Sequence, residues 1–144
     1  MPEPASKSSF RFVTPTPLRW VDVDSEGVVN NAVYLSLMEQ ARFAYFEQLG
    51  LLAGGNVPFV LAETTVRFLR PGRLRMDVAT AARVTRLGRT SFAMEFEVRA
   101  DGGVLASGSA VLVYVDAALK PVPIDALART RIAAFEGIAA ATST

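Results

Sequence analysis

The segment RWVDVDSEGVVNNAVYLSLMEQAR, residues 19–42, decides the fold because it joins a polar turn to the start of a long apolar helix. Two acids, Asp22 and Asp24, stand one residue apart and are followed by a glycine and by paired asparagines. Residues 32–49 contain no Gly or Pro and are rich in helix formers, and Gly50 follows as a C-terminal stop. This pattern predicts a helix of about five turns. Apolar residues occupy most of its circumference, so we expect other elements to cover it on most sides.

Strand-like runs lie on both sides of the predicted helix. The run SFRFVTPTPLRW, residues 9–20, is interrupted by two prolines, which is typical of an edge strand. Four runs follow the helix, VPFVLAETTVRFL, RLRMDVATAARVT, TSFAMEFEVRA and VLASGSAVLVYV, and the second and third alternate between apolar and charged residues. The links RPG, LGR and DGG are short and turn-like, which predicts antiparallel hairpins. Together these elements predict an α+β arrangement of one domain, residues 10–140, after a disordered Pro- and Ser-rich tail at residues 1–9.

A final amphipathic helix is predicted at residues 124–137. The side chains expected to face inward are Ile124, Leu127, Ala128, Ile132 and Phe135.

The composition excludes several kinds of chemistry. The 144 residues include neither cysteine nor histidine, which removes thiolate and imidazole nucleophiles, bases and metal ligands. The carboxylates show no metal-ligand spacing, so we expect no metal. The opening residues lack a signal-peptide pattern and no apolar run reaches the length of a membrane span, so a cytoplasmic location without membrane contact is expected.

The net charge of +1 argues against general nucleic-acid binding, yet seven arginines and a single acid lie in residues 67–89. These arginines alternate with aliphatic residues and not with stacking aromatics, which also disfavours single-stranded nucleic acid.

In its order and spacing the opening segment resembles the signature of the hot-dog fold acyl-CoA thioesterases, in particular the 4-hydroxybenzoyl-CoA thioesterase-like group. That signature runs approximately R-x-x-D-x-D-x-x-G-H-V-N-N-x-x-Y. The positions that fall in register are Arg19, Asp22, Asp24, Gly27, Val29, Asn30, Asn31 and Tyr34. Val28 stands where many members carry histidine. The resemblance continues through RFLRPGRL, RLGRTSF and LVYVD, and covers about residues 10–116.

The resemblance implies a hot-dog fold, with an antiparallel sheet of five or six strands wrapped around the long central helix. It also implies hydrolysis of an acyl-CoA thioester to a free acid and coenzyme A. By the same resemblance Asp24 is the catalytic carboxylate, and the peptide N–H of Asn31 polarises the thioester carbonyl. From the residues alone, a turn or capping role is favoured for Asp24, because an acid before a glycine and ahead of a helix is commonly structural. A carboxylate at this place can attack the thioester or activate a water molecule, and both mechanisms stay open.

Structural or catalytic roles are also expected for four other residues of the segment. Glu39 is the alternative catalytic residue, because a second branch of hot-dog thioesterases uses a helix glutamate, but its spacing from Arg42 also fits an ordinary ion pair. Asp22 is expected to be structural and paired with an arginine or a turn N–H. Asn30 is a candidate N-cap. Tyr34 is expected either to line the substrate site or to pack in the core.

Three residues of the RLGRTS hairpin are candidates for substrate binding: Arg86, Arg89 and Thr90. By resemblance this hairpin holds the nucleotide of coenzyme A, whose phosphates call for arginines. For Arg73, Arg75 and Arg83 a solvated strand face is the expected environment.

These observations predict an acyl-CoA thioesterase without a metal or redox cofactor, since coenzyme A is part of the substrate. The resemblance implies a homodimer or homotetramer with sites at the interface, and an uncovered sheet edge favours self-association. The alternative is a non-catalytic acyl-CoA binding or sensing module, whereas a hydratase is disfavoured by the missing histidine. The apolar residues Met38, Phe43, Phe46 and Phe59 indicate an apolar tunnel for the acyl group.

Overall fold

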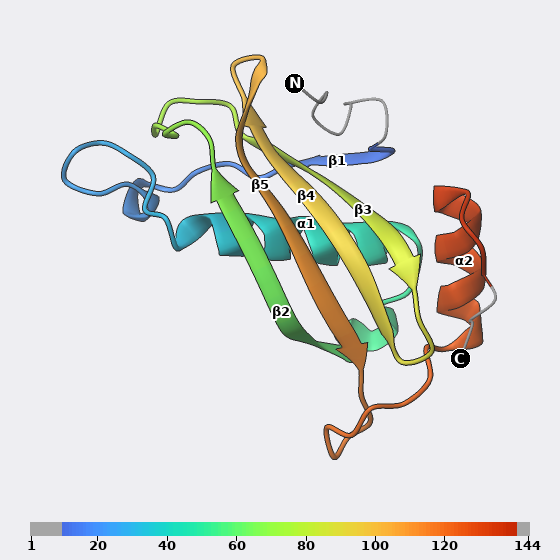
Figure 1. The fold of residues 1–144 in the computed structure, drawn as a ribbon. Coiled ribbons are helices and arrows are strands. Elements are labelled where there is room, and N and C mark those ends of the chain that lie inside the picture. Colours follow the sequence, from blue (N-terminus) through green and yellow to red (C-terminus); the bar gives the residue numbers. More distant parts are fainter. Residues whose placement is uncertain (1–9, 141–144) are drawn as a thin grey trace.

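The computed structural model describes residues 10–140, so the tail predicted at residues 1–9 lies outside the described residues. A five-stranded antiparallel sheet packs against a long helix, which confirms the predicted α+β class (Figure 1). The elements are β1 (Phe12–Pro15), α1 (Val33–Gln48), β2 (Phe59–Phe68), β3 (Ala79–Leu87), β4 (Ser91–Ala100), β5 (Gly103–Tyr114) and α2 (Ala126–Glu136). Short 3-10 turns lie at Trp20–Asp22 and Ala53–Gly55.

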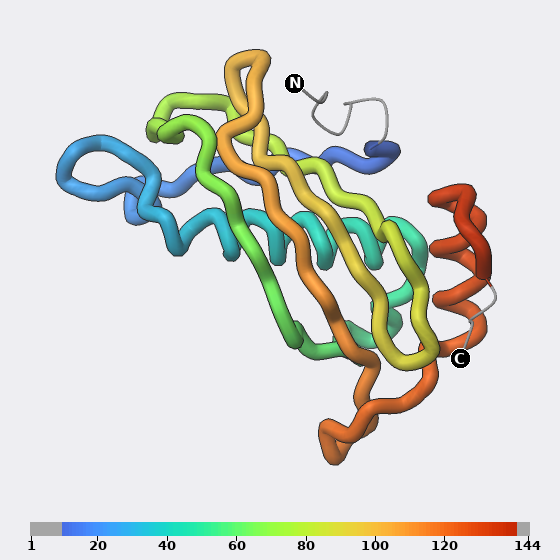
Figure 2. The backbone as a smooth tube through the Cα atoms, viewed as in Figure 1, coloured from blue at the N-terminus to red at the C-terminus, as the bar shows by residue number. Residues whose placement is uncertain are grey.

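The strand order β1-β3-β4-β5-β2 corrects the predicted series of hairpins. The LGR and DGG links do form the β3–β4 and β4–β5 hairpins. The RPG link instead begins a crossover of residues 69–78, because β2 pairs with β5 and β3 lies on the other side of the sheet (Figure 2). The first residues of the predicted strand RLRMDVATAARVT belong to this crossover, where the Met76 N–H donates to the Arg73 carbonyl at 3.1 Å.

Helix α1 lies across β1, β3 and β4 and buries one face against them. Its buried residues are Tyr34, Leu37, Met38, Ala41, Arg42, Tyr45 and Phe46. The prediction that other elements cover α1 on most sides was wrong for this chain, since Leu35 is 44% exposed. The uncovered flank is the one beside β2, which is exposed along nearly its whole length.

The aromatic residues predicted to line a tunnel mostly fill the core. The Phe46 ring packs against Phe59 at 4.8 Å and against Phe92 at 5.4 Å between centroids. Met38 is also buried, whereas Phe43 is half-buried beneath the Arg42 guanidinium. These contacts stabilise the fold by removing large apolar surfaces from water.

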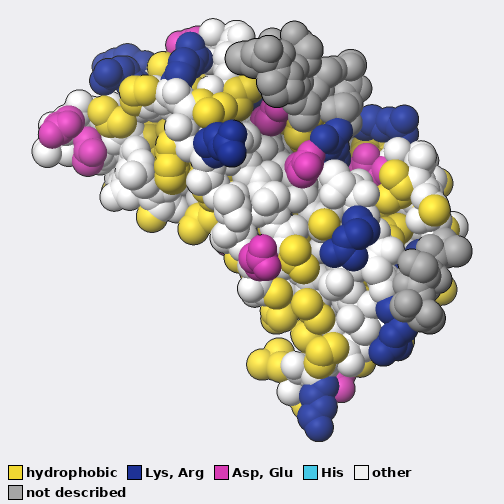
Figure 3. Space-filling model, viewed as in Figure 1, with side chains coloured by type: hydrophobic (Ala, Val, Ile, Leu, Met, Phe, Trp, Pro, Cys, Tyr) yellow, Lys and Arg dark blue, Asp and Glu magenta, His cyan; other side chains and the backbone are white. Residues whose placement is uncertain are grey.

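The face of the sheet turned away from α1 is largely polar. Basic and acidic side chains are scattered over it in the space-filling view (Figure 3). Arg83, expected on a solvated face, is half-buried here: it pairs with Glu95 and stacks over the Phe10 ring at 4.7 Å. Arg73 and Arg75 are exposed, as expected, although they lie in the crossover and not in a strand.

Helix α2 covers the edge of β3 beyond the end of β1. β1 begins at Phe12, opposite Ala82, so among the described residues the Val84 N–H has no strand partner, and it donates to Glu136 Oε2 at 2.9 Å. The buried Tyr45 hydroxyl of α1 donates to the same oxygen at 2.6 Å. Burial, and then the Glu136 carboxylate, raises the pKa of Tyr45 far above its usual value. One carboxylate therefore joins α1, α2 and β3.

The prediction of which α2 side chains face the core was wrong at one position. Leu127 is 49% exposed, and Ala133 is buried instead, beside Ala128 and Ile132. Asp125 caps the helix, because its side chain accepts from the Ala128 N–H at 3.2 Å.

Replacing Glu136 with Ala is expected to lower the free energy of unfolding by about 2 kcal/mol, because the Tyr45 hydroxyl and the Val84 N–H both lose their acceptor. Glu136→Gln is the matched control, since its amide oxygen can still accept. Urea denaturation of the three proteins measures the difference. An equal loss in both variants would show that these hydrogen bonds do not hold the two helices to the sheet.

Candidate functional site

The motif residues form a short two-stranded ribbon ahead of α1. The Asp24 N–H donates to the Val28 carbonyl at 2.9 Å, Val23 bridges Val29, and the Asn30 N–H donates to the Asp22 carbonyl at 2.9 Å. Gly27, with φ of +77°, turns the chain at the tip, a conformation that favours glycine. The ribbon projects at the N-terminal end of α1 (blue in Figure 1).

Gly72 docks this ribbon against the crossover from β2. The Val29 N–H donates to the Gly72 carbonyl at 2.9 Å, and the Gly72 N–H donates to the Tyr34 hydroxyl at 3.1 Å. A Cβ on Gly72 would lie 2.9 Å from the Tyr34 hydroxyl and 3.0 Å from Val29 Cγ2. The RPG sequence indicates only a turn, because nothing local reveals that another chain segment approaches so closely.

Tyr34 packs in the core, which is one of the two alternatives left open by the sequence. Its side chain is 3% exposed, and its ring meets the edge of Phe68 at 5.5 Å between centroids. Burial raises the pKa of its hydroxyl. Its visible role is to fix the start of α1 to the crossover, and direct substrate contact stays a prediction.

Asp22 is a buried structural acid, as predicted. Its carboxylate accepts from the Arg19 backbone N–H at 2.7 Å and from the Arg19 guanidinium at 2.8 Å. The hydrogen bond from that guanidinium holds the pKa of the Asp22 carboxyl below its usual value. The motif arginine therefore serves to neutralise the first acid of the pair.

Asp24 lies on the exposed side of the ribbon. Its Oδ1 accepts from the Glu26 N–H at 2.8 Å and from the Val28 N–H at 3.2 Å. Its Oδ2 has no hydrogen-bond partner within residues 10–140. The turn-capping role is thus real, and it leaves one carboxylate oxygen of Asp24 available.

The start of α1 leaves one peptide N–H available. The Asn30 side chain accepts from the Ala32 N–H at 2.9 Å, the Val33 N–H donates to the Asn30 carbonyl at 2.9 Å, and the Tyr34 N–H donates to the Asn31 carbonyl at 3.4 Å. The prediction that Asn30 is the helix N-cap was wrong: Asn30 caps the turn that precedes the helix, and the N-cap of α1 is Ala32, two residues later. Among the described residues the Asn31 N–H has no acceptor. Asn31 itself is exposed.

Glu39 and Arg42 line a cleft of about 120 Å³ between α1 and β2, with Leu61 and Thr64 on the strand side. The predicted ion pair is present, with Arg42 Nη2 3.7 Å from Glu39 Oε2. The buried partner of this pair is Arg42, whose side chain is 7% exposed, whereas the Glu39 side chain is 55% exposed. Burial lowers the pKa of the Arg42 guanidinium, and within the described chain its Nε has no partner.

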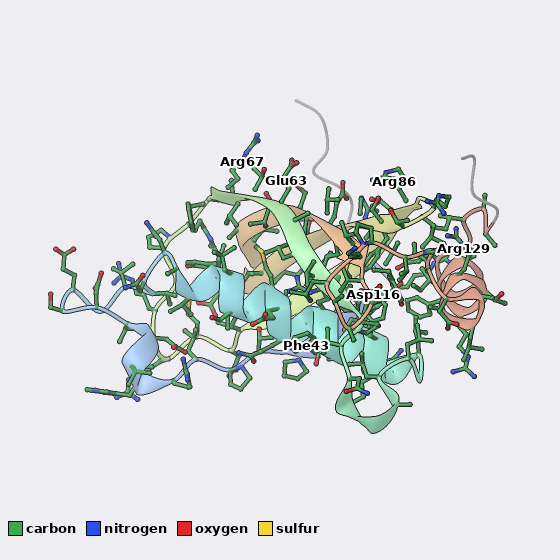
Figure 4. The ribbon with its side chains drawn as sticks, turned by 90° about the horizontal axis from the view of Figure 1, so that it is seen from below. Phe43, Glu63, Arg67, Arg86, Asp116 and Arg129 are labelled. Atoms are coloured by element: carbon green, nitrogen blue, oxygen red, sulfur yellow. The ribbon has the colours of Figure 1, made fainter. Side chains whose placement is uncertain are left out.

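The predicted nucleotide residues lie far from Asp24. Arg86, Arg89 and Thr90 belong to the β3–β4 turn region, at the opposite end of the molecule from the Asp24 ribbon (Figure 1). Arg86 and Glu63 lie on the face of the sheet turned away from α1 (Figure 4), where both line an open hollow of about 310 Å³. The fold thus brings Asp24 and Asn31 onto one ribbon, whereas the three hairpin residues are not part of that site within one chain.

Two further findings concern metal binding and membrane-spanning helices. Over residues 10–140, no group of three acidic side chains could hold a metal ion. In the same part of the chain, neither helix is long and apolar enough to cross a membrane.

Comparison with known proteins agrees with the predicted fold and family. The family model of the thioesterase superfamily matches residues 26–107. The chain belongs to the thioesterase superfamily. It is 30% identical to the acyl-CoA thioester hydrolase YbgC of Escherichia coli O157:H7 over 111 residues, which cover 73% of this chain and 82% of that protein.

This chain is 40% identical to a thioesterase from Thermus thermophilus whose crystal structure is a complex with coenzyme A and Zn. The match has a TM-score of 0.82 and covers 91% of this chain and 98% of that one. The chain is also 26% identical over 124 residues, 82% of its length, to the chloroplastic acyl-acyl carrier protein thioesterase ATL3 of Arabidopsis thaliana, of whose length it spans 65%. These similarities confirm the predicted hot-dog thioesterase fold.

Replacing Asp22 with Asn is expected to lower the melting temperature at pH 7, because the buried acceptor loses its charge beside Arg19. A depressed carboxyl pKa contributes stability above the unfolded value of about 3.9, and this contribution is lost as the pH falls through the folded value. The gap between wild type and variant should therefore narrow below about pH 4. Melting curves from pH 7 to pH 2 measure it, and a gap that stays constant would contradict the assigned ion pair.

Proposed function

We propose that this protein hydrolyses acyl-CoA thioesters to a free carboxylic acid and coenzyme A. The observation that carries the proposal is that one docked ribbon presents both an Asp24 oxygen and the Asn31 N–H, neither of which has a hydrogen-bond partner within residues 10–140. A thioester carbonyl needs both a nucleophile or base and a donor that stabilises the developing oxyanion. The superfamily membership supports thioester hydrolysis as the reaction class.

Asp24 Oδ2 is the proposed reacting atom, and Oδ1 is held by two peptide N–H groups. It acts in one of two ways. As a nucleophile, Oδ2 forms a bond to the thioester carbon, the carbon–sulfur bond breaks to release the coenzyme A thiolate, and water then hydrolyses the mixed anhydride. As a base, Oδ2 takes a proton from the water molecule that attacks the same carbon. In both cases the Asn31 N–H donates to the carbonyl oxygen as charge develops there.

Glu39 is the competing carboxylate. It lies in the cleft beside β2 and is committed to its ion pair with the buried Arg42. A buried guanidinium without a carboxylate partner would be costly, so this pair gives Glu39 a structural purpose. The geometry therefore favours Asp24 for the chemistry.

A complete site is proposed to need a second copy of the chain. The ribbon that carries Asp24 and the β3–β4 turn that carries Arg89 lie at opposite ends of one molecule (Figure 1), so the proposed thioester and nucleotide contacts are assigned to different copies of the chain. β2 pairs on one side only, with β5, and its open edge lies beside the uncovered flank of α1. Self-association along this edge would cover both surfaces. A homodimer, or a homotetramer built from it, is the proposed assembly.

Coenzyme A esters are proposed as the substrates because relatives of this chain are named for them. Acyl-CoA is the substrate class in the name of the Escherichia coli relative, and coenzyme A is bound in the Thermus thermophilus structure. A cytoplasmic location and the absence of a metal or redox cofactor remain predictions.

Asp24→Asn is expected to lower the single-turnover rate on the best acyl-CoA of a substrate panel by at least about a hundredfold, since the amide keeps the shape but loses the nucleophile or base. Glu39→Gln should keep most of the rate and lose stability. Coenzyme A affinity and melting temperature are measured beside the rate, and the Asp24 variant should retain both.

The opposite outcome would place the chemistry elsewhere. Full activity in Asp24→Asn together with a loss in Glu39→Gln would make the helix glutamate the catalytic residue. Tight binding of acyl-CoA without turnover by the wild type would instead favour a non-catalytic binding module.

A further inference from the structure

The β3–β4 turn, residues 88–90, is tied down through its backbone carbonyls. The Gly88 carbonyl accepts from Arg129 Nη2 at 2.7 Å. The Arg89 carbonyl accepts from the Ile124 N–H at 2.9 Å and from Arg129 Nη2 at 3.3 Å. The Thr90 carbonyl accepts from the Tyr114 N–H at 2.8 Å. All three carbonyls of the turn are therefore bonded to the rest of the molecule.

Arg129 is the side chain among these donors. It reaches the turn from α2, which lies beside the end of β3 (Figure 4), and its Nη1 also donates to the Ala140 carbonyl at 3.1 Å. The other two donors are backbone groups, so substitution can remove only the Arg129 contacts. Arg129 is half-buried, which suits a guanidinium that serves as a clamp.

The clamp has an electrostatic consequence for the outer side of the turn. Carbonyl oxygens repel anions, and here all three are occupied by donors of α2, β5 and the segment before α2. The Arg86 side chain lies back over the turn, with Nη1 3.0 Å from the place that a Cβ on Gly88 would occupy. Arg89 is exposed at the same turn. The result is a fixed backbone that carries two guanidinium groups.

We propose that Arg129 is a positioning residue for coenzyme A: by clamping the β3–β4 turn, it holds Arg86 and Arg89 where the phosphate groups of coenzyme A bind. This inference rests on the proposed function, because it assumes that the turn receives the nucleotide end of the substrate. Arg129 itself does not contact the substrate. Its effect passes through the turn, and a turn whose backbone is already fixed loses less conformational entropy on binding than a mobile one.

Arg131 provides a matched control on the same helix. Its Nη1 donates to the Leu49 carbonyl at 2.9 Å and to the Gly50 carbonyl at 3.3 Å. It therefore clamps a different loop, the C-terminal end of α1, by the same kind of contact. A general destabilisation through α2 would affect Arg129 and Arg131 variants alike.

The test compares Arg129→Met, Arg129→Lys, Arg131→Met and Arg89→Ala. Calorimetric titration with coenzyme A gives Kd, and kinetics on the best acyl-CoA and on the pantetheine ester of the same acid give KM and kcat. Arg129→Met is expected to weaken coenzyme A binding about tenfold, with kcat and the pantetheine KM unchanged, because phosphate contacts bind ground and transition states alike. Arg129→Lys should recover part of the affinity, and Arg131→Met should match the wild type.

A double variant, Arg89→Ala with Arg129→Met, tests whether the two act as a unit. The loss of coenzyme A affinity in the double variant should be smaller than the sum of the two single losses, because both single changes weaken the Arg89 contact with phosphate. Fully additive losses, or equal losses on coenzyme A and pantetheine esters, would overturn the positioning role. If Arg89→Ala weakens coenzyme A and Arg129→Met does not, this proposal alone is wrong. If neither variant changes the affinity, the proposed nucleotide site is wrong, and the positioning role falls with it.

Discussion

The close approach of Gly72 to Tyr34 and Val29 is the contact on which the arrangement of the candidate site depends. It joins three parts of the chain that are distant in sequence or differ in direction: the crossover from β2, the ribbon that carries Asp24, and the first turn of α1. A ribbon this short would not hold its own shape in water, because isolated two-stranded hairpins are marginal. Docked on Gly72, the ribbon holds the Asp24 carboxylate and the Asn31 N–H in a fixed position relative to each other.

The same fold leaves the flank formed by α1 and the edge strand β2 uncovered within the described residues. The crossover takes the chain from β2, at one edge of the sheet, to β3 near the other edge, so β2 has a single neighbour and α1 is uncovered beside it. Arg42 is buried on this flank, with a 3.7 Å ion pair to Glu39, its guanidinium over the Phe43 ring, and an Nε that has no partner within residues 10–140. An open strand edge, an uncovered helix and an undercompensated charge are costly together in a single chain. A second copy of the chain, as proposed above, would cover all three.

The sequence predicted those features that depend on neighbouring residues. The extent of α1, the positions of β2, β4 and β5, the LGR and DGG hairpins and the pairing of Asp22 follow from periodicity, turn chemistry and local charge, and the structure confirms them. The predicted start of β3 was wrong, because that strand begins at Ala79, after the crossover. The features that failed are long-range. RPG has the composition of a hairpin turn, but the hydrogen-bond partner of β2 is decided by the whole sheet. The apolar circumference of α1 predicted that other elements cover it on most sides, whereas this chain leaves the flank beside β2 uncovered. The clamp by Arg129 joins residues about forty positions apart, and no local pattern signals it.

The central claim is that the Asn31 N–H stabilises the thioester oxyanion, and Asn31→Pro tests it most directly. Asn31 occupies the second position of the turn from Asn30 to Val33, where proline is favoured, and its N–H has no partner among the described residues, so proline removes the donor without breaking a hydrogen bond seen in the fold. Asn31→Ala is the control, because alanine keeps the N–H. In single-turnover hydrolysis the account predicts a loss of about 10²–10³ in rate for Asn31→Pro, with melting temperature and coenzyme A affinity preserved, and a rate near wild type for Asn31→Ala. Equal rates for the two variants would contradict the account.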